Sequence, residues 1–162
     1  MEFNFTKGEG IIPFVLSQIL DSCVNGITLS DPDQEDNPIV YANEAFELIT
    51  GYNQDEIIGR NCRFLQADDK NQESIGQIRE GIKENKSVTV TLRNYKKDGT
   101  LFYNQFTVRP IYDREGRTIY YLGIQYDITN QVEAEKERSF TGFGPSLIRN
   151  NCHRVTCLRH AS

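Results

Sequence analysis

The chain has 162 residues, which suits one domain with a hydrophobic core plus flanking segments. Hydrophobic residues make up 38% of it and charged residues 25%, and no apolar run approaches the roughly 20 residues that cross a bilayer, so we expect no membrane partner. The net charge is −5, and residues 1–138 carry 15 basic against 23 acidic side chains. This acidic body disfavours nucleic acid as a partner.

The N-terminal part of the chain predicts a short helix and then a hairpin. Pro13 suits the start of a helix, and apolar residues then recur on one helical face at Val15, Leu16, Ile19, Leu20 and Cys23. The segments GITLSD and PIVYAN have the character of strands. The polar turn PDQEDN between them predicts that they pair as a hairpin.

Two short helices with capping signals follow the hairpin. Asn43 is placed to cap the helix EAFELIT, which we expect to end at Gly51. Asn53 with Glu56 three residues later predicts a capping box for QDEII, with Gly59 as its stop. The segment GRNCRFLQ therefore starts just after a helix terminus.

The second half of the chain predicts one helix and an antiparallel meander of three strands. In NQESIGQIREGIKEN, Ile75, Ile78 and Ile82 share a helical face, and Arg79 lies inside that apolar stripe. The strand candidates are SVTVTLRNY, TLFYNQFTVRPI and TIYYLGIQYDI, separated by DG and EG turns.

One face of each of these strands is expected to point inward, because alternate residues of a strand point to opposite faces of a sheet. The inward sets are Val88, Val90, Leu92 and Asn94 in the first strand, Phe102, Asn104, Phe106 and Val108 in the second, and Ile119, Tyr121, Gly123 and Gln125 in the third. Each strand thus carries one primary amide among apolar neighbours.

Three buried amides on one face need hydrogen-bond partners, because an unmet buried carboxamide costs about 1–3 kcal/mol. The amides can bond to backbone or to one another. A flat heterocycle with donors and acceptors along its edge would satisfy all three. Gly123, which has no side chain, would let such a ring approach the sheet closely.

Two arginines favour an anionic group beside this heterocycle. Arg79 either extends to solvent or has an anionic partner, because burial of an unpaired guanidinium is costly. Arg63 directly follows Cys62, and two guanidinium groups suit a phosphate. Ring edge, phosphate and thiol together describe a nucleotide cofactor, although the sequence has no glycine-rich phosphate loop of the Rossmann or Walker type.

The stretch NPIVYANEAFELITGYNQDEIIGRNCRFLQ, followed by IREGI, VTVTLRNYKKDG, FYNQ and GIQYDIT, resembles a LOV domain, the flavin-binding photosensory branch of the PAS family. The resemblance runs from about Gly26 to Thr129, and NCRFLQ is its most specific motif. It implies an α+β PAS fold, with a five-stranded antiparallel sheet, short helices on one face and flanking terminal helices. Ala67 departs from the family pattern, since many members have glycine there.

By matching positions, the resemblance implies that the cofactor is noncovalently bound FMN. Arg63 and Arg79 would hold its phosphate. Asn94, Asn104 and Gln125 would bind the polar edge of its ring system. The remaining candidate cofactor-binding residues are Thr28, Asn37, Asn61, Gln66, Phe106 and Gly123.

The resemblance also makes Cys62 the photoactive residue. Under blue light its sulfur would bond to ring carbon C4a of the flavin, and this adduct would revert in darkness. A thiol is a weak nucleophile until it is deprotonated or meets an unusually reactive electrophile, which here is the excited flavin. Gln125 is the candidate signal relay, because its strand leads directly into the segment DITNQVEAEKER.

Three other interpretations stay open. A haem sensor needs an axial ligand, and the histidines, His153 and His160, lie in the C-terminal tail. A flavin redox sensor would bind the cofactor without productive photochemistry, and a PAS interaction module would bind no ligand. No catalytic triad, metal cluster or kinase motif is visible in the sequence, so we predict neither an enzyme nor a metal site.

Four segments are predicted along the chain. They are an N-terminal cap helix at 1–25, the LOV/PAS sensor at 26–129, a C-terminal linker helix at 130–141, and a basic tail at 142–162 that we expect to be disordered or an artificial extension. The N-terminus lacks the basic start and apolar stretch of a secretion signal, which predicts a cytoplasmic location.

Two kinds of partner are expected. The outward face of the last strand is apolar and needs cover, which favours a homodimer through Tyr120, Leu122, Ile124 and Tyr126. An effector domain or partner protein is expected outside this chain, which would be either a short stand-alone LOV protein or an excised sensor.

Overall fold

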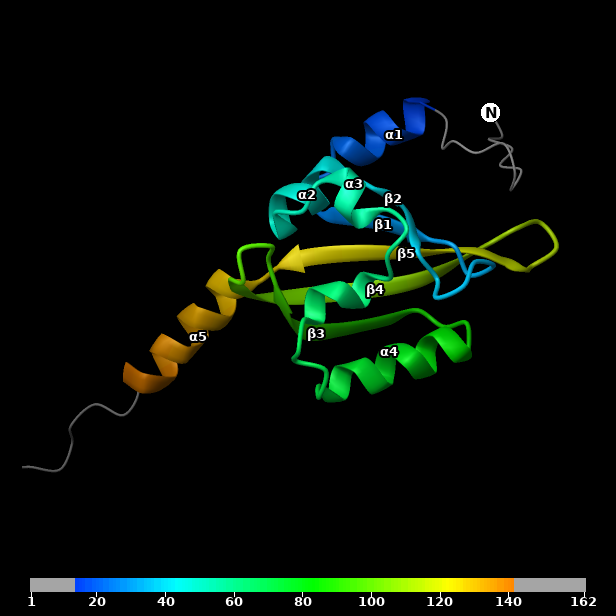
Figure 1. Cartoon of the computed structure of the whole chain (residues 1–162). Coiled ribbons are helices and arrows are strands. Elements are labelled where there is room, and N and C mark those ends of the chain that lie inside the picture. Colours follow the sequence, from blue (N-terminus) through cyan, green and yellow to red (C-terminus); the bar gives the residue numbers. More distant parts are fainter. Residues whose placement is uncertain (1–13, 142–162) are drawn as a thin grey trace, which may run out of the picture. The chain divides into compact units, whose positions relative to one another are not determined.

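The protein is described by a computed structural model that covers residues 14–141. Its centre is a five-stranded antiparallel sheet with strand order β2-β1-β5-β4-β3 (Figure 1). The strands are β1 (Gly26–Ser30), β2 (Ile39–Ala42), β3 (Val88–Tyr95), β4 (Leu101–Tyr112) and β5 (Thr118–Asp127). The predicted α+β fold with a five-stranded antiparallel sheet is confirmed.

The helices are short, and α2 and α3 begin at the capping residues predicted from the sequence. They are α1 (Phe14–Asp21), α2 (Glu44–Thr50), α3 (Gln54–Ile57), the 3-10 helix η1 (Cys62–Gln66), α4 (Glu73–Lys83) and α5 (Thr129–Thr141). Asn43 Oδ1 accepts from the Phe46 amide at 3.1 Å, and α2 ends at Gly51 in the left-handed region. The predicted capping box of α3 is also present, with the Asn53 amide donating to Glu56 Oε2 at 3.0 Å.

Strand alternation holds along the whole meander. β3 pairs with β4 so that Leu92 lies opposite Asn104, and β4 pairs with β5 so that Phe106 lies opposite Gln125. The inward residues predicted from the sequence are buried or half-buried, whereas Thr91 and Gln105 between them are exposed. The three amides are the most deeply placed polar groups of the meander, at 2% exposure or less for Asn94, Asn104 and Gln125.

Two hydrophobic clusters flank the inward face of the sheet. One joins β2, α2, α3 and η1 through Ile39, Ala42, Phe46, Ile57 and Leu65, and Cys62 packs against it. The other joins α4 to β3 through Ile75, Val90 and Leu92, with Ile78 and Phe106 alongside. The helices η1 and α4 are therefore fixed over the same face of the sheet.

The lead helix α1 is held by polar contacts more than by its apolar stripe. Asn43 Nδ2 donates to the carbonyl oxygens of Leu20 and Asn25, both at 2.9 Å, while Asn43 Oδ1 also accepts from the Ile27 amide. Ile19, which belongs to the apolar face predicted for this helix, is 55% exposed. The C-terminal end of α1 is thus anchored, while this apolar side chain faces solvent.

The chain divides into two compact units after Asn130. The first holds the sheet and α1 to α4, and the second holds most of α5. No helix within residues 14–141 is long and apolar enough to cross a membrane. Pro13 and the basic tail at 142–162 lie outside the described residues.

Candidate functional site

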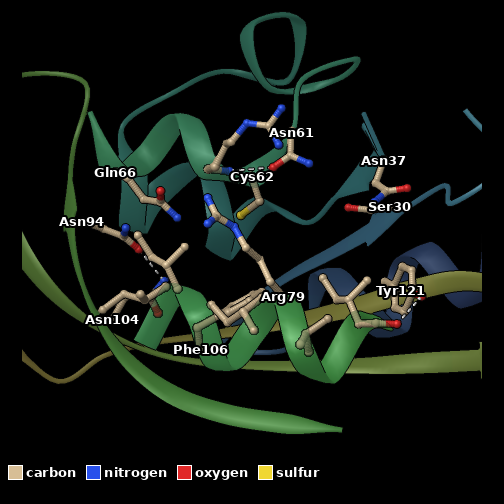
Figure 2. Close-up of a pocket in the computed structure, with 16 residues that line it drawn as sticks. Ser30, Asn37, Asn61, Cys62, Gln66, Arg79, Asn94, Asn104, Phe106 and Tyr121 are labelled. Atoms are coloured by element: carbon tan, nitrogen blue, oxygen red, sulfur yellow. Dashed lines mark hydrogen bonds between the residues drawn. The ribbon is translucent and has the colours of Figure 1, made fainter. Parts of the chain in front are cut away.

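A cavity of about 280 Å³ lies between the inward face of the sheet, η1 and α4 (Figure 2). Nine of the twelve candidate residues line it, namely Asn37, Asn61, Cys62, Arg63, Gln66, Arg79, Asn94, Asn104 and Phe106. Seven further residues complete its wall, namely Ser30, Ile75, Ile78, Ile82, Leu92, Val108 and Tyr121. An apolar cavity with a few convergent polar groups is the usual form of a small-molecule site.

The sheet wall of this cavity carries unmet hydrogen-bond acceptors. Asn104 Nδ2 donates to Asn94 Oδ1 at 2.9 Å, and Asn94 Nδ2 donates to the Arg93 carbonyl at 3.1 Å. Asn104 Oδ1 and Gln125 Oε1 are buried and, among the described residues, have no partner. Each unmet acceptor costs about 1–3 kcal/mol, so this wall is built for a ligand that donates hydrogen bonds.

Three candidate residues on the inward face of the sheet are not among those that line the cavity, namely Thr28, Gly123 and Gln125. Thr28 pairs in register with Gly123, and a Cβ placed on Gly123 would lie 2.5 Å from Thr28 Oγ1 and 3.1 Å from Gln125 Nε2. The space above Gly123 is thus filled by the protein's own side chains. The expectation that Gly123 lets a ring approach the sheet closely stays a prediction.

Cys62 is the first residue of η1, and its position is set by the residue before it. Asn61 Oδ1 caps η1 by accepting from the Arg63 amide at 3.0 Å, and Asn61 Nδ2 donates to the Asp36 carbonyl at 2.6 Å. Cys62 Sγ lies 4.0 Å from Gln125 Nε2. Burial raises the pKa of Cys62 to about 12, so the sulfur is a protonated thiol at neutral pH.

Both arginines line the cavity, and they differ in their surroundings. Arg63 forms an ion pair with Asp36, a residue of the β1–β2 loop. Arg79 extends from α4 into the cavity toward Cys62 (Figure 2), and no described acid pairs with it. Both guanidinium groups therefore bring positive charge to a cavity that amides also line.

Sequence reasoning did not select two polar lining residues, Ser30 and Tyr121. Tyr121 lies on the predicted inward face of β5, and its hydroxyl contacts the Ile82 carbonyl at 3.3 Å and Asn85 Oδ1 at 3.1 Å. The alternation of inward and outward residues along β5 could therefore have identified Tyr121 as a lining residue. Ser30 shares the inward face of β1 with Thr28 by alternation and pairs in register with Tyr121, so strand alternation could have found it as well.

The residues of the cavity fit a flavin. Two orphaned acceptors and two amide nitrogens match a ring edge that has both donors and acceptors, and the apolar side chains from α4, β3 and β4 match its faces. The guanidinium groups match a phosphate. Within residues 14–141 no group of three or more metal-ligating side chains is present.

Comparisons with known proteins agree with this fit. A family model described as PAS domain matches residues 24–130. A "Blue-light photoreceptor" of Listeria monocytogenes is 43% identical over 129 residues, which are 78% of this chain and 51% of that protein. "Blue-light-activated histidine kinase 1" of Erythrobacter litoralis is 48% identical over 115 residues, which are 71% of this chain and 32% of the kinase.

A solved structure named "Flavin Analogue Sheds Light on Light-Oxygen-Voltage Domain Mechanism" superposes with a TM-score of 0.68 at 35% identity. The match covers 80% of this chain and 97% of the solved one. The chain thus spans nearly all of a solved domain, but only about half or less of the two longer relatives.

Proposed function

The chain belongs to the PAS family and, within it, is a LOV domain, and from this premise we propose that it senses blue light through FMN held in the cavity. The observation that carries the proposal is a half-buried thiol 4.0 Å from Gln125 Nε2, together with two buried amide oxygens, of Asn104 and Gln125, that have no partner among the described residues. A flavin chromophore accounts for both, and the relatives' names support light as the stimulus.

In this proposal each wall of the cavity has one task. Asn94 and Asn104 bind the polar edge of the ring, and the isoleucines of α4 pack against its face. Arg63 and Arg79 hold the phosphate, which distinguishes FMN from riboflavin. Asn61 keeps Cys62 in place by capping η1 and binding the Asp36 carbonyl.

Cys62 is the reacting residue of the proposal. The flavin, when bound and excited by blue light, supplies an electrophilic ring carbon to which Cys62 Sγ bonds reversibly. Because burial keeps the sulfur protonated in the dark, the thiol brings its own proton to the reaction. A thiolate at this depth would be costly and would react with oxidants in darkness, so the raised pKa preserves the resting state.

The test of the function is optical. The purified full chain should be yellow, and blue light should bleach it in the absence of added reductant, with recovery in darkness. Bleaching that requires a reductant would favour the flavin redox sensor. A colourless protein that fails to take up added flavin would favour an interaction module.

Signal transmission is proposed to run through Gln125 into α5. Gln125 lies next to the thiol, and the strand that carries it reaches α5 within four residues. The junction is tied to β4, because the Tyr103 carbonyl accepts from the Ile128 amide at 2.9 Å and the Tyr103 amide donates to Thr129 Oγ1 at 3.0 Å. Rotation of the Gln125 amide would change the position or stability of this junction between β5 and α5.

Assembly and output belong to the same proposal. The outward face of β5 is partly exposed and apolar, with Tyr126 at 47%, and we expect it to form a homodimer. Light scattering over a range of concentrations should show dimers, and Tyr126→Glu should shift them toward monomers. A concentration-independent monomer would contradict this assembly. The effector is proposed to lie outside this chain, which itself acts as a sensor without enzymatic activity.

A further inference from the structure

The two arginines that line the cavity are not equivalent. Arg63 already has an anionic partner, because its guanidinium group is paired with the Asp36 carboxylate. Arg79 lines the same cavity without an acidic partner among the described residues. An anion that enters the cavity therefore meets the available guanidinium of Arg79 and the guanidinium of Arg63, whose charge Asp36 already balances.

Asp36 is held beside Arg63 by its backbone as well as by its charge. Its carbonyl accepts from Asn61 Nδ2 at 2.6 Å, and Asn61 in turn caps η1, in which Arg63 is the second residue. Asp36 and Asn37 both have left-handed backbone conformations, with φ of 70° and 48°. This loop geometry directs the Asp36 carboxylate toward η1, so the acid is a fixed neighbour of Arg63.

We propose that Asp36 is a specificity-determining residue that limits the preference of the cavity for phosphorylated flavin, and that Arg79 is the dominant phosphate-binding arginine. The inference rests on the proposed function. A phosphate bound by Arg63 must share its guanidinium with Asp36 or displace Asp36, and the negative charge of Asp36 beside Arg63 opposes it. Arg79 has neither restriction.

The experiment measures how strongly the flavin-free full chain prefers FMN to riboflavin. Both flavins are titrated by fluorescence quenching, and the ratio of their dissociation constants reports the phosphate contribution alone. The variants are Asp36→Asn, Arg63→Gln, Arg79→Gln and the double variant Asp36→Asn with Arg63→Gln. Asparagine is chosen because it tolerates the left-handed backbone of residue 36. Glu35→Gln is the matched control, since it removes one negative charge from the same loop at an exposed residue.

The ion pair between Asp36 and Arg63 sets the expected order of the effects on the preference for FMN over riboflavin. Arg79→Gln should lower the preference about tenfold and Arg63→Gln only about twofold, while Asp36→Asn should raise it about threefold, in line with the modest worth of exposed ion pairs. In the Asp36→Asn background Arg63→Gln should cost more than it does in the unmodified chain. The gain from Asp36→Asn should shrink at high salt, because both side chains are about half exposed.

Several outcomes would overturn the inference. An unchanged or lower preference in Asp36→Asn would show that the acid does not oppose phosphate, and an equal loss in the two single arginine variants would remove their inequivalence. A gain in Glu35→Gln as large as that in Asp36→Asn would reduce the effect to general loop charge. If the unmodified chain binds neither flavin, the proposed function itself fails, and the inference falls with it.

Discussion

The two walls of the cavity are built differently. The sheet wall is regular backbone whose inward amides are almost fully buried, and two of their oxygens have no partner among the described residues. Besides α4, the opposite side has a helical wall made of η1 and the β1–β2 loop, a region in which Asp36, Asn37 and Ala67 all have positive φ. The sheet wall holds hydrogen-bond acceptors without partners in a rigid frame. The helical wall holds the Cys62 thiol on a short, locally strained segment.

This difference separates recognition from reaction. A rigid sheet keeps acceptors in place at a cost in stability, which natural proteins accept at binding sites. A 3-10 helix of five residues makes few internal hydrogen bonds, so its position depends on Asn61 and on side-chain packing. Changes to the sheet wall should therefore alter binding, and changes to the helical wall should alter photochemistry or stability.

The largest effect is expected for Cys62→Ala. The variant should still bind flavin and remain yellow, because the amides and arginines are untouched, but light-driven bleaching should be lost completely. Absorption spectra recorded before and after blue illumination give the measurement. Cys23→Ala is the matched control, because Cys23 is the other described thiol and does not line the cavity; its Sγ donates to the Ile19 carbonyl.

Persistence of reversible bleaching in Cys62→Ala would show that the helical wall is not the reacting one. Loss of flavin binding in that variant would instead mean that the helical wall also contributes to binding, contrary to the proposed separation of binding and reaction.

The second effect concerns the sheet wall. The double variant Asn94→Leu with Asn104→Leu should weaken flavin binding about a hundredfold, because the polar edge of the ring then lacks its partners. The same change removes an orphaned buried oxygen, so the flavin-free protein should melt at a higher temperature. Titration and thermal melting of the two proteins measure both quantities.

Gln105→Leu is the control for this wall, since it makes the same type of change on the exposed face of β4. It should leave affinity unchanged. If the double variant binds flavin as tightly as the unmodified chain, residues other than Asn94 and Asn104 must recognise the ring.

The contrast between the walls also explains how much the sequence predicts. The inward amides of Asn94, Asn104 and Gln125 follow from strict alternation, because one slip of register would exchange both faces. The caps at Asn43 and Asn53 follow from local chemistry of three or four residues. These features depend on short-range rules, and the structure contains them.

Features of the helical wall depend on longer-range geometry. The ion pair of Asp36 with Arg63 joins residues 27 positions apart and requires two consecutive left-handed residues that are not glycine. Neither a long-range ion pair nor a pair of left-handed residues produces a periodic pattern in the sequence. Thr28 and Gly123 do not line the cavity, because a Cβ on Gly123 would lie 2.5 Å from Thr28 Oγ1 and the two residues share one space. The fold and the polar inward face of the sheet could thus be predicted, whereas the contacts between the β1–β2 loop and η1 could not.

A third effect tests the connection between the walls. Gln125 lies on the inward face of the sheet, and its Nε2 is 4.0 Å from the Cys62 thiol of the helical wall. Gln125→Leu should preserve bleaching, shift the flavin absorption slightly and suppress the light-induced change in hydrogen exchange of α5, because leucine cannot exchange donor for acceptor. A full light response of α5 in this variant would require transmission by another route.

The smallest effect concerns strain in the helical wall. Ala67 ends η1 with φ of 47° and ψ of −123°, a conformation close to the first central position of a type II′ turn, where glycine is favoured. Its Cβ is strained there by about 1–3 kcal/mol. Ala67→Gly removes this strain but loses about 0.5–1 kcal/mol through the greater freedom of the unfolded chain.

The net stabilisation expected for Ala67→Gly is about 1 kcal/mol, which corresponds to a rise in melting temperature of about 2–4 °C for a domain of this size. Ala45→Gly, within α2, is a matched control and should lower the melting temperature by a similar amount, because glycine is unfavourable inside a helix. A lower melting temperature in Ala67→Gly would show that the contacts of η1 already relieve the strain. The helical wall would then be as well fitted as the sheet wall, and the distinction between a strained reacting wall and a rigid binding wall would be lost.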